Sequence, residues 1–158
     1  MKSPRSIALD SNVLTLFIVG LYNRNAISKH RRLKAYEASH FDKLVALIES
    51  FDYLVTTPQS LAEVSNLLDF DKQSARHTMG LLKGLLQGAS SQDEIHEQLF
   101  PSRLIVEEES YMWLGLADAS FVQLAKRGVP VITADARLFA RLIAFNSQCV
   151  NFITYAFS

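Results

Sequence analysis

The sequence predicts an α/β fold in which helices cover both faces of a parallel sheet. Short apolar runs typical of buried strands alternate with longer segments whose apolar residues recur at helical spacing. The chain has 158 residues, 49% of them hydrophobic, and no repeat, low-complexity tract or linker divides it. Because strands that alternate with helices form parallel sheets, we expect residues 1–158 to fold as one such domain.

The first half of the chain is expected to hold two strands, each followed by helices. Residues 7–9 predict the first strand, and after the polar turn 10–12 the apolar residues resume at helical spacing over 13–20. Residues 23–34 are polar and predict an exposed loop, which leads into a helix over 33–51. Residues 53–56 predict the second strand. Thr57-Pro58 is a typical helix start, because threonine caps the first turn and proline fits inside it.

The second half is expected to continue the alternation with a higher share of helix. Helical spacing covers residues 72–99, with a break near 88–91. Residues 104–106 fit either a strand or the start of a helix. A helix is predicted over 114–126, a turn at 128–130, a buried strand over 131–133, a helix over 136–145 and a last strand over 152–157.

Charge and cysteine content exclude several classes of protein. The 16 basic and 16 acidic residues cancel, so the chain is not a uniformly basic coat for nucleic acid. The most apolar stretch, residues 13–22, is about half the length that spans a bilayer, and Asp10 and Asn12 interrupt any signal peptide. The single cysteine, Cys149, is interpreted as a small core residue. We therefore expect a cytoplasmic protein without a membrane span.

Four acidic residues are expected to meet at the carboxyl ends of the strands. Asp10 closes the first strand, Glu63 lies in the second turn of the helix after the second strand, and Asp135 follows the strand 131–133. Asp118 is the one charged residue in the apolar segment 111–122. Each acid alone has an ordinary interpretation as a helix cap, a solvated residue or a buried hydrogen-bonded carboxylate. Together they predict a site, because open parallel sheets bind ligands at this edge.

Carboxylates that converge without basic partners repel one another, raise one another's pKa values and destabilise the fold, and hard divalent cations naturally compensate for this. Mg²⁺ and Mn²⁺ prefer oxygen ligands, retain several water molecules and are held by a few carboxylates. Such an ion lowers the pKa of a bound water and stabilises the leaving oxygen of a phosphodiester. The sequence therefore predicts metal-dependent phosphodiester hydrolysis, with Asn12 and Thr133 orienting the carboxylates.

Four segments resemble, in order, the successive motifs of PIN domains. They are Ile7-Ala8-Leu9-Asp10-Ser11-Asn12-Val13-Leu14, Thr57-Pro58-Gln59-Ser60-Leu61-Ala62-Glu63-Val64, Gly115-Leu116-Ala117-Asp118-Ala119-Ser120 and Val131-Ile132-Thr133-Ala134-Asp135. The resemblance implies a three-layer α/β/α fold and a Mg²⁺- or Mn²⁺-dependent ribonuclease that acts on single-stranded RNA. It implies that the catalytic and metal-binding acids are Asp10, Glu63, Asp118 and Asp135, supported by Asn12 and Thr133. Many relatives are VapC-like toxins held inactive by an antitoxin protein and often homodimeric, so both partners are expected.

A basic segment offers a weaker prediction of RNA binding. Between residues 23 and 34 there is no acid, and the cations are Arg24, Lys29, Arg31, Arg32 and Lys34. They fit either contacts to an RNA backbone or a solvated loop. The flanking Tyr22 and Tyr36 fit base stacking, although the helical spacing of Tyr36 favours the core.

Other functions and features stay open at this stage. The main alternative is a catalytically degenerate PIN-like module that binds a protein or RNA partner, since Ala136 and Arg137 follow Asp135 where many relatives have a further acid. A phosphoacceptor signalling domain fits less well. The glycines at 80, 84 and 88 would let another helix approach, either within the chain or in a dimer. The four histidines are expected at the surface, and residues 107–109 as a solvated helix start.

Overall fold

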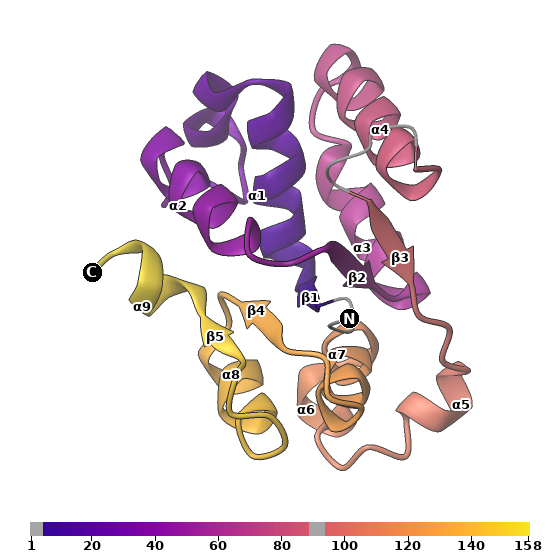
Figure 1. Ribbon diagram of the computed structural model, residues 1–158. Helices are drawn as coiled ribbons and strands as arrows, with labels where there is room; N and C mark the ends of the chain where they lie inside the picture. The colour runs from indigo at the N-terminus through magenta and orange to yellow at the C-terminus, as the bar shows by residue number, and fades with distance from the viewer. Residues whose placement is uncertain (1–4, 89–93) are drawn as a thin grey trace.

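Five strands form one parallel sheet at the centre of the molecule. The computed structural model describes residues 5–88 and 94–158, and the predicted break near 88–91 lies mostly outside this part. The strands are β1 (Ser6–Leu9), β2 (Tyr53–Thr56), β3 (Ile95–Glu97), β4 (Val131–Thr133) and β5 (Val150–Asn151). Their order is β3-β2-β1-β4-β5, and every neighbouring pair is parallel (Figure 1).

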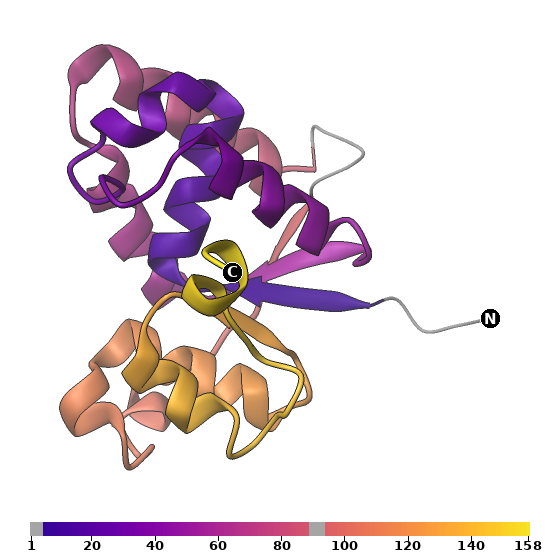
Figure 2. The same cartoon turned by 90° about the vertical axis from the view of Figure 1, so that its left-hand side faces the viewer.

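Helices cover both faces of this sheet, as the two views show (Figures 1 and 2). One layer holds α1 (Ser11–Tyr22), the 3₁₀-helix η1 (Arg24–Lys29), α2 (Ala38–Ile48), α3 (Pro58–Leu68) and α4 (Lys72–Leu86). The other holds α5 (Ser102–Ile105), α6 (Tyr111–Leu114), α7 (Leu116–Lys126) and α8 (Ala136–Leu142). Helix α9 (Phe152–Ala156) joins the first layer against α2. The predicted three-layer α/β/α architecture with a parallel sheet is confirmed.

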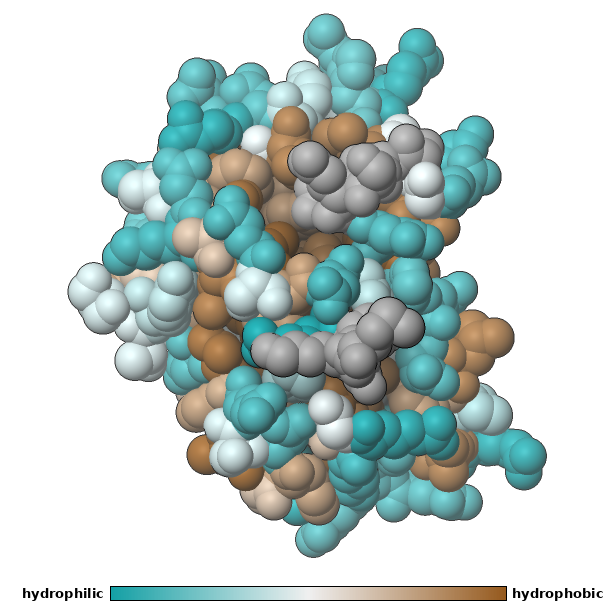
Figure 3. Space-filling view, in the orientation of Figure 1, coloured by the Kyte–Doolittle hydropathy of each residue, from teal (hydrophilic) through white to brown (hydrophobic). Residues whose placement is uncertain are grey.

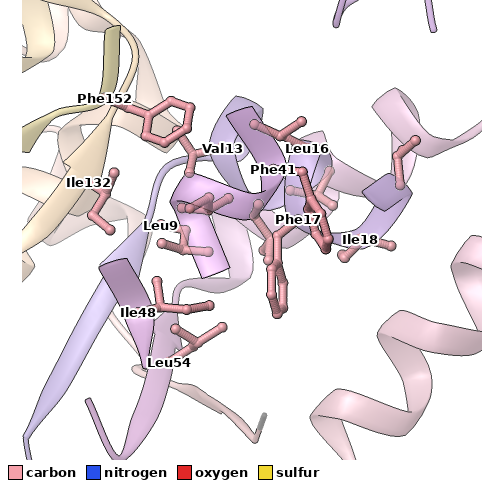
Figure 4. Close-up of a cluster of buried hydrophobic side chains, with 14 of the residues drawn as sticks. Leu9, Val13, Leu16, Phe17, Ile18, Phe41, Ile48, Leu54, Ile132 and Phe152 are labelled. Carbon is pink, nitrogen blue, oxygen red and sulfur yellow. The ribbon is translucent and has the colours of Figure 1, made fainter. Parts of the chain in front are cut away.

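Two hydrophobic cores separate the sheet from its helical layers. Successive side chains of a strand point to opposite faces, so Ile7 and Leu9 of β1 enter the core under α1 whereas Ala8 enters the core under α7. Figure 4 shows the first core, in which Phe17 of α1 lies beside Phe41 of α2. Cys149 is buried in the second core, as predicted.

Helix α1 is the most enclosed helix of the described chain, with buried residues on almost every side. Gly20 lies in its last turns, and a Cβ atom there would overlap the ring of Phe41. This glycine therefore sets how closely α2 approaches α1. Two of the glycines singled out in the sequence, Gly80 and Gly88, do not act in this way. A Cβ at Gly80 meets nothing within 4 Å, and Gly88 lies beyond the end of α4.

The segment between α1 and α2 is more buried than predicted. Instead of one exposed loop it forms η1, and it places Ile27, His30 and Leu33 in the interior. His30 Nε2 donates to the Leu67 carbonyl at 2.8 Å and Nδ1 accepts from the Arg32 amide at 3.1 Å, so both ring nitrogens are used. Burial lowers the pKa of His30. The prediction of a surface histidine is wrong here, because a neutral ring with two partners is stable inside a protein.

Several element boundaries also differ from the predictions. Helix α2 begins at Ala38 rather than near residue 33, and α8 ends at Leu142 rather than 145. Residues 102–105 are helical, which settles the open assignment. Residues 95–97 form the edge strand β3 instead of continuing a helix, and only Ile95 of its three residues is buried, too few for a visible alternation.

The predicted last strand over 152–157 is helix α9 instead. The side chain of Asn151 accepts from the amides of Ile153 and Thr154 and so starts the helix. Phe152 and Ala156, four residues apart, are its buried positions. Within the described residues, every helix is too short or too polar to cross a membrane.

Candidate functional site

The candidate site lies where the chain leaves two neighbouring strands in opposite directions. After β1 the chain enters α1 in one layer, and after β4 it enters α8 in the other layer. Such a switch point opens a crevice outside the carboxyl ends of a parallel sheet. Figure 3 views the molecule from the amino ends of the strands and shows a surface of intermixed hydrophilic and hydrophobic residues. The carboxyl ends of the strands, where the candidate site is placed, lie at the opposite end, as Figure 2 shows for β1.

Asp10 is the most constrained of the four predicted acids. It is 2% exposed and caps α1, with Oδ1 accepting from the Val13 amide at 2.8 Å. Its Oδ2 accepts from Thr133 Oγ1 at 2.5 Å and from the Ala134 amide at 3.2 Å. Burial nevertheless raises the pKa of Asp10 to about 6, which exceeds the opposing effect of these hydrogen bonds. The side chain is thus held in place while its charge remains only partly compensated.

Thr133 connects Asp10 to Asp135. The Thr133 hydroxyl donates to Asp10 and accepts from the Asp135 amide at 3.0 Å. Asp135 in turn caps α8, since its Oδ1 accepts from the amides of Arg137 and Leu138 at 2.8 and 3.0 Å. The hydrogen bonds found in the described residues leave Asp135 Oδ2 without a donor. Thr133 therefore lies where its predicted supporting role requires it.

Asp118 lies close enough to the other three acids for their negative charges to raise its pKa. It is the third residue of α7 and is half-buried. Burial, followed by the negative charges of Asp10, Glu63 and Asp135, raises the pKa of Asp118 to about 7. Glu63 is exposed on α3 and faces this group from the other helical layer. Within residues 5–88 and 94–158, none of the four acids forms an ion pair with a basic side chain.

Buried hydroxyl pairs join the elements that carry these acids, and the sequence analysis missed them. Ser11 Oγ lies 2.9 Å from Ser60 Oγ and links α1 to α3. Thr57 Oγ1 lies 2.7 Å from Ser120 Oγ and links the start of α3 to α7. All four hydroxyls belong to the same short motifs as Asp10, Glu63 and Asp118. That proximity in sequence is the signal that could have identified them.

Within the described residues, the other predicted side chains form no hydrogen bond or ion pair with the four acids. Asn12 is exposed, and its side chain forms no hydrogen bond in the described part of the chain. The basic residues Arg24, Lys29, Arg31, Arg32 and Lys34 are all exposed, and Arg24 pairs with Asp42 at 2.5 Å. Arg24 comes two residues after Tyr22, the last residue of α1, which lies about 18 Å along that helix from Asp10.

Neither of the tyrosines that flank this basic segment, Tyr22 and Tyr36, is an exposed side chain on which a base could stack. Tyr36 is 7% exposed and packs against Phe152, as its helical spacing predicted. Burial and the nearby charge of Asp10 raise the pKa of Tyr36 to about 12, so the end of the segment returns toward the acids. Tyr22 stacks on His77 with ring centroids 5.3 Å apart.

The donor chemistry of the site suits a hard divalent cation. Four carboxylates and a threonine hydroxyl are oxygen donors of the kind that Mg²⁺ and Mn²⁺ bind. Among the described residues, however, no three His, Cys, Asp or Glu side chains are grouped tightly enough to hold one ion without rearrangement. Mg²⁺ retains several waters and uses one or two carboxylates, so the arrangement fits a hydrated ion rather than a cage of protein ligands.

Comparisons of the chain with protein-family models, curated proteins and solved structures found no match.

Proposed function

We propose that the chain is a Mg²⁺- or Mn²⁺-dependent endoribonuclease that hydrolyses RNA phosphodiester bonds, as its resemblance to PIN domains implies. The observation that carries this proposal is that Asp118 lies near the three other carboxylates at the ends of β1 and β4 and on α3, and none of the four forms an ion pair within the described residues. A divalent cation would relieve the repulsion among these carboxylates, and in its absence the raised pKa values of Asp10 and Asp118 let bound protons do so.

The acids have different parts in the proposed site. Asp10, fixed by three hydrogen bonds, is the rigid ligand, and Thr133 keeps its carboxylate in one orientation. Asp118 is the acid whose charge changes nearest neutral pH. Glu63 on α3 and Asp135 at the start of α8 flank the site from the two helical layers. A bound Mg²⁺ or Mn²⁺ supplies a water of lowered pKa and positive charge for the leaving oxygen.

The decisive experiment compares the wild-type chain with Asp118→Asn on a panel of tRNA and unstructured RNA. Each protein is incubated with Mn²⁺, with Mg²⁺ or with EDTA. We expect cutting that requires metal and falls at least 100-fold in the variant, while Glu49→Gln, an exposed acid at the end of α2, cuts like wild type. Equal cutting by wild type and Asp118→Asn, or cutting in EDTA, would refute the proposal.

A second candidate function is a degenerate PIN-like module that binds RNA or a protein without cutting. The absence of a preformed three-ligand group in the described residues, and Arg137 at the α8 start, favour it. Wild-type protein that binds RNA but cuts none of the panel with either metal would establish this alternative.

The antitoxin, the homodimer and the cytoplasmic location stay predictions. Light scattering after size exclusion tests the dimer, and co-purification with a protein encoded beside this one tests the antitoxin.

A further inference from the structure

One exposed apolar feature lies on α6, directly before the helix that carries Asp118. Met112 and Trp113 of α6 are 83% and 49% exposed, whereas Tyr111 and Leu114 of the same helix are half-buried against the second core. The inward residues therefore hold the short helix in place and leave Met112 and Trp113 facing solvent. A hollow of about 510 Å³ lies along them, lined by residues 111–116.

The position of this feature relative to the acids is fixed by backbone contacts. Gly115, with φ of 86°, ends α6 and begins α7, whose third residue is Asp118. On the other side, Arg137 Nη2 donates to the Trp113 carbonyl at 3.3 Å. The Arg137 amide is itself bound by Asp135 at 2.8 Å. The Trp113 backbone is thus linked to Asp118 through the short segment that follows it, and to Asp135 through Arg137.

Its chemistry matches an unpaired nucleotide rather than an apolar peptide. An exposed indole ring offers a flat surface on which any base can stack. The exposed Arg137 places a guanidinium at the Trp113 carbonyl, and this cation can contact an RNA phosphate close to acids that repel it. The surface area of two apolar side chains and one cation is far smaller than the area that a stable protein interface buries.

We propose that Trp113, with Met112 and Arg137, forms a subsite on which an unpaired base of single-stranded RNA stacks beside the carboxylates. The placement of this subsite beside a nuclease centre rests on the proposed function. The subsite itself binds RNA whether or not a phosphodiester bond is cut. It selects single-stranded RNA because a base paired in a duplex has no free face for the indole.

The test uses binding rather than cleavage. Trp113 is the single tryptophan of the chain, so its fluorescence reports this position alone. In buffer with EDTA, the wild-type protein is titrated with single-stranded RNA, with an abasic strand of equal length and with duplex RNA. We expect quenching by the single strand, about tenfold weaker binding of the abasic strand and little quenching by the duplex.

Variants separate stacking from other effects, with binding followed by anisotropy of labelled RNA. Trp113→Ala should weaken binding about tenfold, Trp113→Phe should retain most of it, and Leu99→Ala, an exposed apolar residue near β3, should bind like wild type. Unchanged binding by a folded Trp113→Ala, equal affinity for the abasic strand, or no binding of RNA would overturn the subsite. A partner protein that binds to this chain through Trp113 in the absence of RNA would also overturn the proposed subsite. Quenching without any cleavage would refute the nuclease and leave the subsite intact.

Discussion

The hydroxyl of Thr133 donates to the carboxylate of Asp10 at 2.5 Å, between residues 123 positions apart in the chain. This bond joins the end of β4 to the end of β1, two neighbouring strands after which the chain enters opposite helical layers. The same hydroxyl accepts from the Asp135 amide, so one side chain fixes the relation between two of the acids. Asp10 is therefore a structural cap and a candidate ligand at once.

Replacing Thr133 by valine should destabilise the protein. Valine has a similar shape but no hydroxyl, so Asp10 loses a hydrogen bond to its charged form and the Asp135 amide loses its acceptor. We expect a loss of about 1–3 kcal/mol in the free energy of unfolding at pH 8, measured by urea denaturation. Thr133→Ser keeps the hydroxyl and should lose less. Equal losses in the two variants would show that the methyl group, not the hydrogen bond, matters.

Asp118→Asn should stabilise the metal-free protein at pH 8. The change removes a half-buried charge that three carboxylates repel, and the structure gives Asp118 no ion pair to lose. We expect an increase on the order of 1 kcal/mol, seen as a rise of a few degrees in Tm. Asp10→Asn should do the reverse, because an amide nitrogen cannot accept the bonds that both Asp10 oxygens now receive. A lower Tm for Asp118→Asn would contradict the electrostatic account.

Without metal, the wild-type protein should lose stability as the pH rises from 4 to 8. The folded-state pKa values of Asp10 and Asp118, about 6 and about 7, exceed the ordinary value of 3.8. Between these values the folded state binds more protons than the unfolded state, so the free energy of unfolding falls with increasing pH. Thermal melts in EDTA measure this. Mn²⁺ should raise Tm more at pH 8 than at pH 5, because protonated acids are poor ligands.

The sequence was sufficient to predict the parallel α/β fold and the strand ends at which Asp10 and Asp135 lie, for a physical reason. Short apolar runs ending in Asp10 and Asp135 mark strands whose carboxyl ends share an edge, and local capping chemistry marks the helices that follow. What the sequence could not predict depends on long-range contacts. His30 was expected at the surface, because only the folded chain brings the Leu67 carbonyl to its ring.

Glu108 shows the same limit more clearly. Three consecutive glutamates predicted a solvated helix start, yet the Glu108 side chain is 1% exposed and its partner Arg141 lies 33 residues away. Nothing in the local pattern distinguishes it from Glu107 and Glu109, which are exposed. The four serine and threonine hydroxyls lie in the same motifs as the acids, but which of them pair could not be predicted, since each pair joins residues at least 49 positions apart.

Gly20→Ala should destabilise the packing of α1 against α2. A methyl group at this position overlaps the Phe41 ring, and the enclosed helix has little room to shift. We expect a loss of about 1–3 kcal/mol by chemical denaturation, larger than the gain in helix propensity. Gly80→Ala is the matched control, because its Cβ would meet nothing and should stabilise by up to about 1 kcal/mol. In a double-mutant cycle with Phe41→Leu, absence of coupling would show that another contact is responsible.

Glu108→Gln should destabilise the second helical layer in a pH-dependent manner. Glu108 Oε1 lies 2.6 Å from Arg141 Nη2 and 3.4 Å from Lys126 Nζ, and Oε2 accepts from the Ser110 amide at 2.7 Å. These partners hold the pKa of Glu108 at about 2 despite its burial.

Because the folded-state pKa of Glu108 lies below its ordinary value, its contribution is present above pH 4.5 and is lost as the pH falls toward 2. Removing the charge leaves the guanidinium of Arg141 unpaired, so we expect a loss of about 2 kcal/mol at pH 7 that shrinks in acid. Glu109→Gln is the control. Glu109 is 78% exposed and 3.9 Å from the same arginine, and it should change stability by less than about 0.5 kcal/mol. Urea denaturation of both variants at pH 7 and pH 3 measures the difference, and equal losses at the two pH values would show that shape rather than charge makes Glu108 necessary.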